Sequence, residues 1–187
     1  MEKRRSEELQ NSEIKKIKGM LSKKGVTIST DANFESLTLR GFGVLENERL
    51  ILNFFEALFL QSKEMLEVFA KSGKVLNFQE LLRQFESLDE SVWVKYLIYR
   101  DLRSRGYVVR EGFGLGIDFR VYERGEYGKA TAPYLVFGLQ EGKPISMKDL
   151  ANVLKHAQGL KKDLVMAVLN RRGEIVYYTI SKLTMKK

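Results

Sequence analysis

Residues 95–125 carry the pattern that most limits the possible fold, a helix followed by a tight glycine stop and two strands. In the second strand Ile117, Phe119 and Val121 alternate with polar residues, and a period of two is typical of a half-buried strand. Gly106 is expected to end the helix, because a residue without a β-carbon adopts the left-handed C-terminal conformation at little cost. The stretch therefore predicts two neighbouring strands of a sheet beside a helix.

The polar stretch 86–91 lies between two apolar patterns and indicates a domain boundary. Residues 1–24 read as a basic segment, either a helix or a frayed tail. Residues 25–86 predict a small N-terminal α+β domain, in which the apolar segment 47–65 is too long for one strand and favours a buried helix. Residues 87–187 alternate strands with helices. The sequence thus predicts an α+β fold, with a small N-terminal α/β module followed by a C-terminal domain that has a mixed sheet and flanking helices.

The charge balance favours a polyanionic partner. The formal net charge is +8, and Lys and Arg side chains neutralise phosphates and release their counterions. Much of the excess lies near the two chain ends, where a solvated tail is the simpler account. The lack of cysteine excludes a disulfide framework and a thiolate zinc site. Because no segment approaches the ~20 apolar residues of a membrane span, we expect a soluble, cytoplasmic protein with no membrane association.

Two motifs resemble the archaeal tRNA-splicing endonucleases. Residues 116–125 read GIDFRVYERG and match a family pattern close to G-x-D-F-x-x-Y-x-x-G, in which the tyrosine is Tyr122. Residues 161–167 read KKDLVMA and match a basic residue followed by K-x-L-x-x-A, in which the lysine is Lys162. Lys155 stands where the family usually has an arginine that helps to sandwich a bulged RNA base, and lysine stacks less well. The resemblance spans nearly the whole chain and implies a nuclease-like C-terminal domain.

The resemblance also implies RNA cleavage without a metal or other cofactor. The RNA 2′-OH attacks the adjacent phosphorus, so an enzyme needs a base, an acid and a cation, which the family supplies as Tyr, His and Lys. Tyr122 would then be the base and Lys162 the stabiliser of the phosphorane, with Arg120 and Lys155 contacting RNA. The family's histidine precedes the next strand, but Thr131 stands there, and its hydroxyl does not titrate near neutral pH. The only histidine, His156, matches no catalytic position.

These residues favour the structural, non-catalytic subunit of a heterotetrameric tRNA-splicing endonuclease, paired with a catalytic paralogue and acting on precursor tRNA. Two alternatives stay open: a catalytic subunit that uses Tyr122 and Lys162, and an RNA-binding scaffold that shares the fold. The β-forming run near the C-terminus would invite association at an unpaired edge, so we expect Tyr177 or Tyr178 in a subunit interface. The resemblance further implies that Glu141 docks on a partner's basic cleft, the alternative being an ordinary exposed turn.

Overall fold

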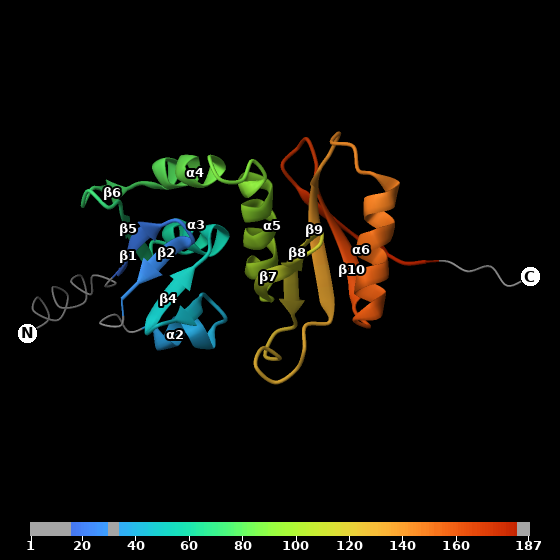
Figure 1. Ribbon diagram of the computed structural model, residues 1–187, viewed down its shortest axis with the longest axis horizontal. Coiled ribbons are helices and arrows are strands. Elements are labelled where there is room, and N and C mark those ends of the chain that lie inside the picture. Colours follow the sequence, from blue (N-terminus) through green and yellow to red (C-terminus); the bar gives the residue numbers. More distant parts are fainter. Residues whose placement is uncertain (1–15, 30–33, 183–187) are drawn as a thin grey trace, which may run out of the picture. The chain divides into compact units, whose positions relative to one another are not determined.

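The computed structural model describes residues 16–29 and 34–182, which fall into two compact units (Figure 1). One unit holds the described residues up to Thr38 together with Gly43–Leu88, and the other holds Leu39–Phe42 and the described residues from Asp89 onward. Four residues from the N-terminal part of the sequence therefore pack with the C-terminal unit. No helix in the described ranges is long and apolar enough to cross a membrane.

The N-terminal unit is built on a six-stranded mixed sheet in the order β3-β4-β2-β1-β5-β6. Only β1 and β5 pair in parallel. Residues 1–15 of the predicted basic segment lie outside the described part. For Ile17–Ser22 the expectation of a helix or tail is wrong, because these residues pair with strands on both sides. The strands are β1 (Ile17–Ser22), β2 (Gly25–Ile28), β3 (Val44–Glu46), β4 (Arg49–Leu52), β5 (Leu66–Phe69) and β6 (Val75–Leu76).

Helices α2 (Glu35–Leu39), α3 (Phe54–Ser62) and α4 (Phe78–Glu86) complete this unit, except that the last residue of α2, Leu39, groups with the C-terminal unit. The expectation of one helix from residue 47 is wrong at its start, because β4 pairs there with β2 and the helix begins only after Asn53. The Asn53 side chain accepts the N–H of Glu56 in a capping box, which supplies the missing partner for a first-turn donor. Asn77 and Glu80 form a second capping box at the start of α4.

The C-terminal unit is a five-stranded mixed sheet between two helices (Figure 1). The strand order is β11-β10-β9-β8-β7, and only β9 and β10 are parallel. On α5 the ring of Tyr99 packs 6.3 Å from that of Phe119, while Val153 of α6 packs in a cluster with Leu135. The elements are α5 (Val92–Ser104), β7 (Val108–Gly114), β8 (Ile117–Tyr122), β9 (Tyr134–Gln140), α6 (Met147–Gly159), β10 (Asp163–Leu169) and β11 (Ile175–Ile180).

Local signals in this unit agree with the sequence. Gly106 ends α5 with φ at +93°, and the N–H of Tyr107 donates to the Leu102 carbonyl at 3.2 Å, as in a Schellman cap. In β8 the alternation of buried and half-buried residues follows the predicted period of two. Helix α5 begins after Ser91, whose side chain makes no capping bond. The predicted α+β class is confirmed, with two mixed sheets and five helices among the described residues.

Candidate active site

The strand register brings the predicted catalytic positions to one edge of the C-terminal sheet. Because β8 is antiparallel to β9 and β9 is parallel to β10, the end of β8 lies beside the starts of the other two strands. Val121 pairs with Tyr134, which in turn pairs with the first residue of β10. Tyr122 directly follows Val121, Thr131 shortly precedes β9, and Lys162 directly precedes β10. The topology therefore places all three positions at the same edge.

The C-terminal cap of α6 fixes Lys162. Its N–H donates to the Ala157 carbonyl at 3.0 Å, and the N–H of Lys161 donates to the Gln158 carbonyl at 3.0 Å, which are the two bonds of a Schellman motif. Lys161 occupies the left-handed position, with φ at +54°. Glycine is usual there, because a β-carbon in this conformation costs roughly 1–2 kcal/mol. The cap holds Lys162 in place despite this strain.

The ammonium of Lys162 donates a hydrogen bond to Oγ1 of Thr131 at 2.8 Å. This contact is exposed to solvent, so an anionic ligand can reach it. A lysine ammonium offers three N–H donors and a positive charge to phosphate oxygens, whereas a threonine hydroxyl has no proton to give up near neutral pH. The pair can therefore bind an anion and stabilise developing negative charge, and the Thr131 hydroxyl does not replace the imidazole that the family uses as its acid.

The ring of Tyr122 packs against a second tyrosine that the sequence did not single out. Tyr127 lies in the connection between β8 and β9, and the two ring centroids are 5.1 Å apart with the planes at 89°. Within residues 123–130 Tyr127 alone is half-buried, and its neighbours are exposed. The connection has no periodic pattern, so one tyrosine between two glycines gave no sequence signal.

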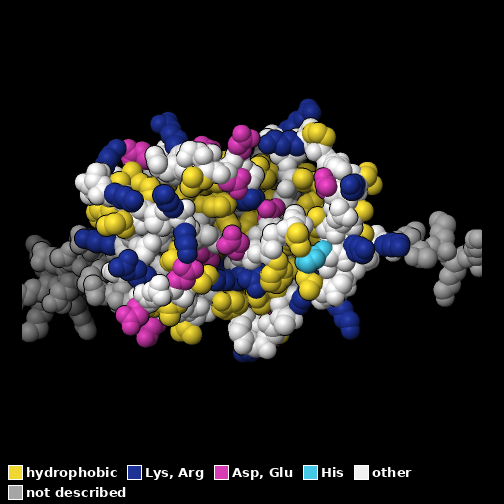
Figure 2. All heavy atoms as spheres, in the orientation of Figure 1, with side chains coloured by type: hydrophobic (Ala, Val, Ile, Leu, Met, Phe, Trp, Pro, Cys, Tyr) yellow, Lys and Arg dark blue, Asp and Glu magenta, His cyan; other side chains and the backbone are white. Residues whose placement is uncertain are grey.

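The two predicted RNA-contact residues lie on different elements. The guanidinium of Arg120 stacks 4.6 Å from the centroid of the Phe113 ring, and its Nε donates to the Glu111 carbonyl at 2.8 Å. Lys155 is exposed on α6 and lines a shallow surface hollow with His156, the only histidine, which is visible in Figure 2. The contacts of Arg120 hold its guanidinium on its own hairpin, whereas Lys155 points to solvent. Their role in RNA binding stays a prediction.

The Asp-Phe pair of the first motif has a structural role in the C-terminal unit, away from the edge that carries Tyr122. Oδ2 of Asp118 accepts the N–H of Gly138 at 2.7 Å, and its Oδ1 lies 3.4 Å from Nζ of Lys95. Lys95 also lies 2.8 Å from Oδ2 of Asp89. This cluster joins the start of α5 to β8 and β9, while the following residue of the motif, Phe119, packs on α5.

Burial and charge pairing shift the pKa values of this cluster in opposite directions. Burial raises the pKa of Asp118 and outweighs the opposing hydrogen bond from Gly138 and the charge of Lys95. Burial alone would also raise the pKa of Asp89, but hydrogen bonds from Lys95 and Ser91 outweigh it and lower that pKa. Burial would lower the pKa of Lys95, but its bond to Asp89 and the charges of both carboxylates raise it. The lysine is therefore held charged between two acids.

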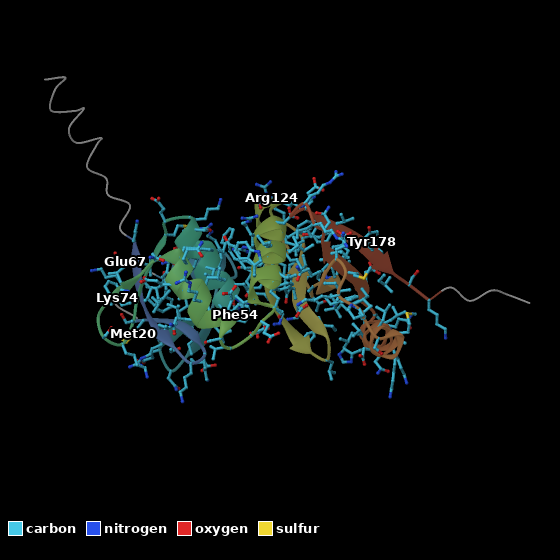
Figure 3. The ribbon with its side chains drawn as sticks, turned by 90° about the horizontal axis from the view of Figure 1, so that it is seen from above. Met20, Phe54, Glu67, Lys74, Arg124 and Tyr178 are labelled. Atoms are coloured by element: carbon cyan, nitrogen blue, oxygen red, sulfur yellow. The ribbon has the colours of Figure 1, made fainter. Side chains whose placement is uncertain are left out.

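The residues predicted at subunit interfaces make contacts within the chain. Oε2 of Glu141 accepts the N–H of Arg171 at 2.8 Å. The hydroxyl of Tyr177 donates to Asp101 at 2.7 Å, and burial together with this bond raises the pKa of Tyr177. Tyr178, labelled in Figure 3, is 49% exposed on the edge strand β11. Of the two tyrosines, Tyr178 is thus the one that presents more surface, and the interface roles stay predictions.

Metal ligands do not gather in the described ranges, where no three Asp, Glu or His side chains lie close enough to hold an ion. The chemistry that the described site offers rests on its tyrosine, its lysine and the hydroxyl of Thr131.

Comparison with known proteins places both units in one family. The model of the tRNA intron endonuclease N-terminal domain matches residues 17–82, and that of the catalytic C-terminal domain matches residues 92–177. The chain is 33% identical over 171 residues to the tRNA-splicing endonuclease of Methanococcus vannielii, covering 91% of this chain and 97% of that protein. It is 36% identical over 141 residues to that of Thermococcus onnurineus, covering 75% and 81%. The chain therefore belongs to the tRNA intron endonuclease family.

Proposed function

We propose that this chain is the structural, non-cleaving subunit of a heterotetrameric tRNA-splicing endonuclease. A catalytic paralogue that carries the missing histidine would be its partner, and precursor tRNA in the cytoplasm would be the substrate. The assembled enzyme would remove introns at bulge-helix-bulge sites and leave 2′,3′-cyclic phosphate and 5′-OH ends. Family membership supports the substrate class, and the residue at position 131 supports the structural role.

The observation that carries the proposal is the hydroxyl of Thr131 bonded to Lys162 at 2.8 Å. Cleavage needs a group that protonates the leaving 5′ oxygen, and the position that would hold the acid is filled by a side chain that cannot perform this step. Loss of a positioned general acid slows a reaction by about 10²–10⁴-fold. Tyr122 and Lys162 without an acid would therefore bind RNA better than they cut it.

The retained Tyr122 and Lys162 favour a second candidate, a catalytic subunit in which Tyr122 is the base, Lys162 stabilises the phosphorane, and water or a distant group supplies the proton. The two candidates differ in what the isolated chain does. We expect the structural subunit to leave a bulge-helix-bulge RNA uncut under single-turnover conditions, whereas the catalytic candidate would cut it without any partner.

The decisive experiment is single-turnover cleavage by the assembled complex. Tyr122→Phe in this chain should change the rate by less than about threefold, because both cuts would be made at the partner's triad. The matched control is the same substitution at the corresponding tyrosine of the partner, which should abolish cleavage. A fall of a hundredfold or more with Tyr122→Phe in this chain would mean that it supplies the base, and the structural role would be wrong.

A gain-of-function variant tests whether the missing acid at position 131 is what prevents cleavage. Thr131→His places an imidazole at the edge beside Lys162, and Thr131→Ala removes the hydroxyl without adding an acid. Cleavage by the isolated Thr131→His chain, but not by Thr131→Ala, would show that only the acid is missing from this site.

A further inference from the structure

Tyr127 lies between Tyr122 and a segment from the N-terminal part of the sequence. We call residues Leu39–Phe42 the strap, since this segment packs with the C-terminal unit although the model of the N-terminal domain spans it. The ring of Tyr122 stands perpendicular to that of Tyr127, with 5.1 Å between the two centroids. Gly41 of the strap, which is buried, also lies next to the Tyr127 ring.

Two arginines of the C-terminal unit hold the strap by its backbone. Both Nη atoms of Arg103 donate to the Arg40 carbonyl at 3.1 Å, and Nη1 of Arg110 donates to the Gly41 carbonyl at 2.8 Å. The guanidinium of Arg103 also stacks 3.9 Å from the centroid of the Phe42 ring, which is fully buried. Charge-assisted bonds to main-chain oxygens with a stacked ring beneath them fix a backbone segment closely.

Gly41 approaches Tyr127 so closely that no side chain fits between them. A β-carbon at Gly41 would lie 3.3 Å from Cε1 of Tyr127 and 2.4 Å from Cγ1 of Val108. Its φ of +74° is also one that residues with side chains rarely adopt. At Gly41 the strap therefore presents bare backbone to the tyrosine ring.

The strap contacts two residues that neighbour Tyr122, namely Val108 and Tyr127. Val108, which Gly41 contacts, is the β7 residue paired directly with Tyr122 in the sheet. Tyr127 meets the ring of Tyr122 itself. Tyr122 is the last residue of β8, so both contacts lie where the strand ends.

We propose that Tyr127 is a positioning residue for Tyr122, and that the strap holds Tyr127 through Gly41. Edge-to-face packing favours one orientation of the Tyr122 ring, and a hydroxyl that is displaced by about 1 Å loses most of its value in a reaction. The inference goes beyond the proposed function, because it concerns how the hydroxyl is held and applies whether this chain cleaves RNA or only binds it.

The test places 3-fluorotyrosine at position 122 of the full-length chain and records its fluorine NMR resonance. We expect one narrow line in the parent protein. Tyr127→Ala should shift that line toward the frequency of the free amino acid and broaden it, since the ring would sample several rotamers. Tyr127→Phe keeps the packing ring and should restore the parent line. Circular dichroism and urea unfolding confirm that each variant is folded when it is measured.

Glycine variants test the strap independently, which matters if Tyr127→Ala does not fold. Gly41→Ala should shift the line, because its methyl group must push Tyr127 or Val108 aside. Gly73→Ala in the N-terminal unit is the matched control: its φ of +83° is equally unfavourable, but apart from its chain neighbours nothing lies within 4 Å of the added carbon. A parent-like line in folded Tyr127→Ala, or in folded Gly41→Ala, would refute the proposal. A merely stabilising Tyr127 would lower the urea midpoint and leave the line as narrow as in the parent.

Discussion

Lys95→Met should destabilise the protein strongly, because it leaves a buried carboxylate without its cation. Lys95 and Asp118 keep only 25% and 20% of their side-chain surface exposed, and their charges lie 3.4 Å apart. At an effective dielectric constant of about 20 that separation corresponds to roughly 5 kcal/mol of attraction, most of which offsets desolvation. Breaking such a pair by removing one partner costs about 3–5 kcal/mol when it is fully buried. The remaining exposure favours a smaller loss, about 2–3 kcal/mol.

Urea unfolding at a series of pH values measures this loss. The raised pKa of Asp118 in the folded protein should rise further in the variant, so the folded state gains stability from protonation as the pH falls. In the parent, the stability that Asp89 contributes through its lowered pKa is lost over the same acidic range. The unfolding free energies of the parent and the variant should therefore differ most near neutral pH and become similar at acidic pH.

Two further variants make this prediction sharp. Lys24→Met breaks an exposed pair with Glu46, whose side chains are 70% and 44% exposed, and should cost less than about 0.5 kcal/mol. Asp118→Asn in the Lys95→Met background removes the unpaired charge and keeps an oxygen for the Gly138 N–H, so it should recover part of the loss. A pH-independent loss in Lys95→Met, or one no larger than that of Lys24→Met, would refute the reasoning.

Other consequences can be checked by stability and assembly measurements. Lys161→Gly relieves the left-handed strain of the α6 cap and should raise the unfolding free energy by about 0.5–1 kcal/mol. Gly106→Ala, at the equivalent position of the α5 cap, should lower the unfolding free energy by about 1 kcal/mol or more. A change of the unfolding free energy in the same direction for both variants, measured by urea unfolding, would contradict this. Tyr177→Phe removes the bond to Asp101 and should cost about 1 kcal/mol. Because the pKa of Tyr177 is raised in the folded state, its contribution is present below about pH 10 and lost above it, so the variant should show a flatter alkaline profile. Glu141→Ala should weaken the tetramer and reduce the salt dependence of its assembly in sedimentation experiments, unless the carboxylate serves only the Arg171 turn.

Elements with short-range signals were predictable from the sequence. The capping box at Asn77, the glycine stop at Gly106 and the alternation of β8 depend on residues within a few positions of one another. Strand β4 was missed because its apolar run continues directly into that of α3, and only pairing with β2 shows it to be a strand. Periodicity cannot separate two adjoining apolar elements of different type.

The candidate site was predictable only where it resembled a family motif. Tyr122 and Lys162 stand in recognisable patterns, and the register explains how they reach one edge. Tyr127 and the strap gave no signal, because their contacts join residues that are far apart in the chain and depend on backbone approach. Lys161 was missed for a different reason: the left-handed cap is usually a glycine, and here the nearby Gly159 ends the helix without adopting that conformation.

The strap has a consequence for recombination between relatives. A crossover at the predicted boundary near residue 86 would combine one parent's strap with the other parent's Arg103, Arg110 and Tyr127. A foreign side chain in place of Gly41 would then meet Val108 and Tyr127 at distances that leave no room for it. Chimaeras should therefore inherit Leu39–Phe42 and the C-terminal half from the same parent, and a fragment that begins at residue 87 should be supplied with this tetrapeptide to rebuild its own packing.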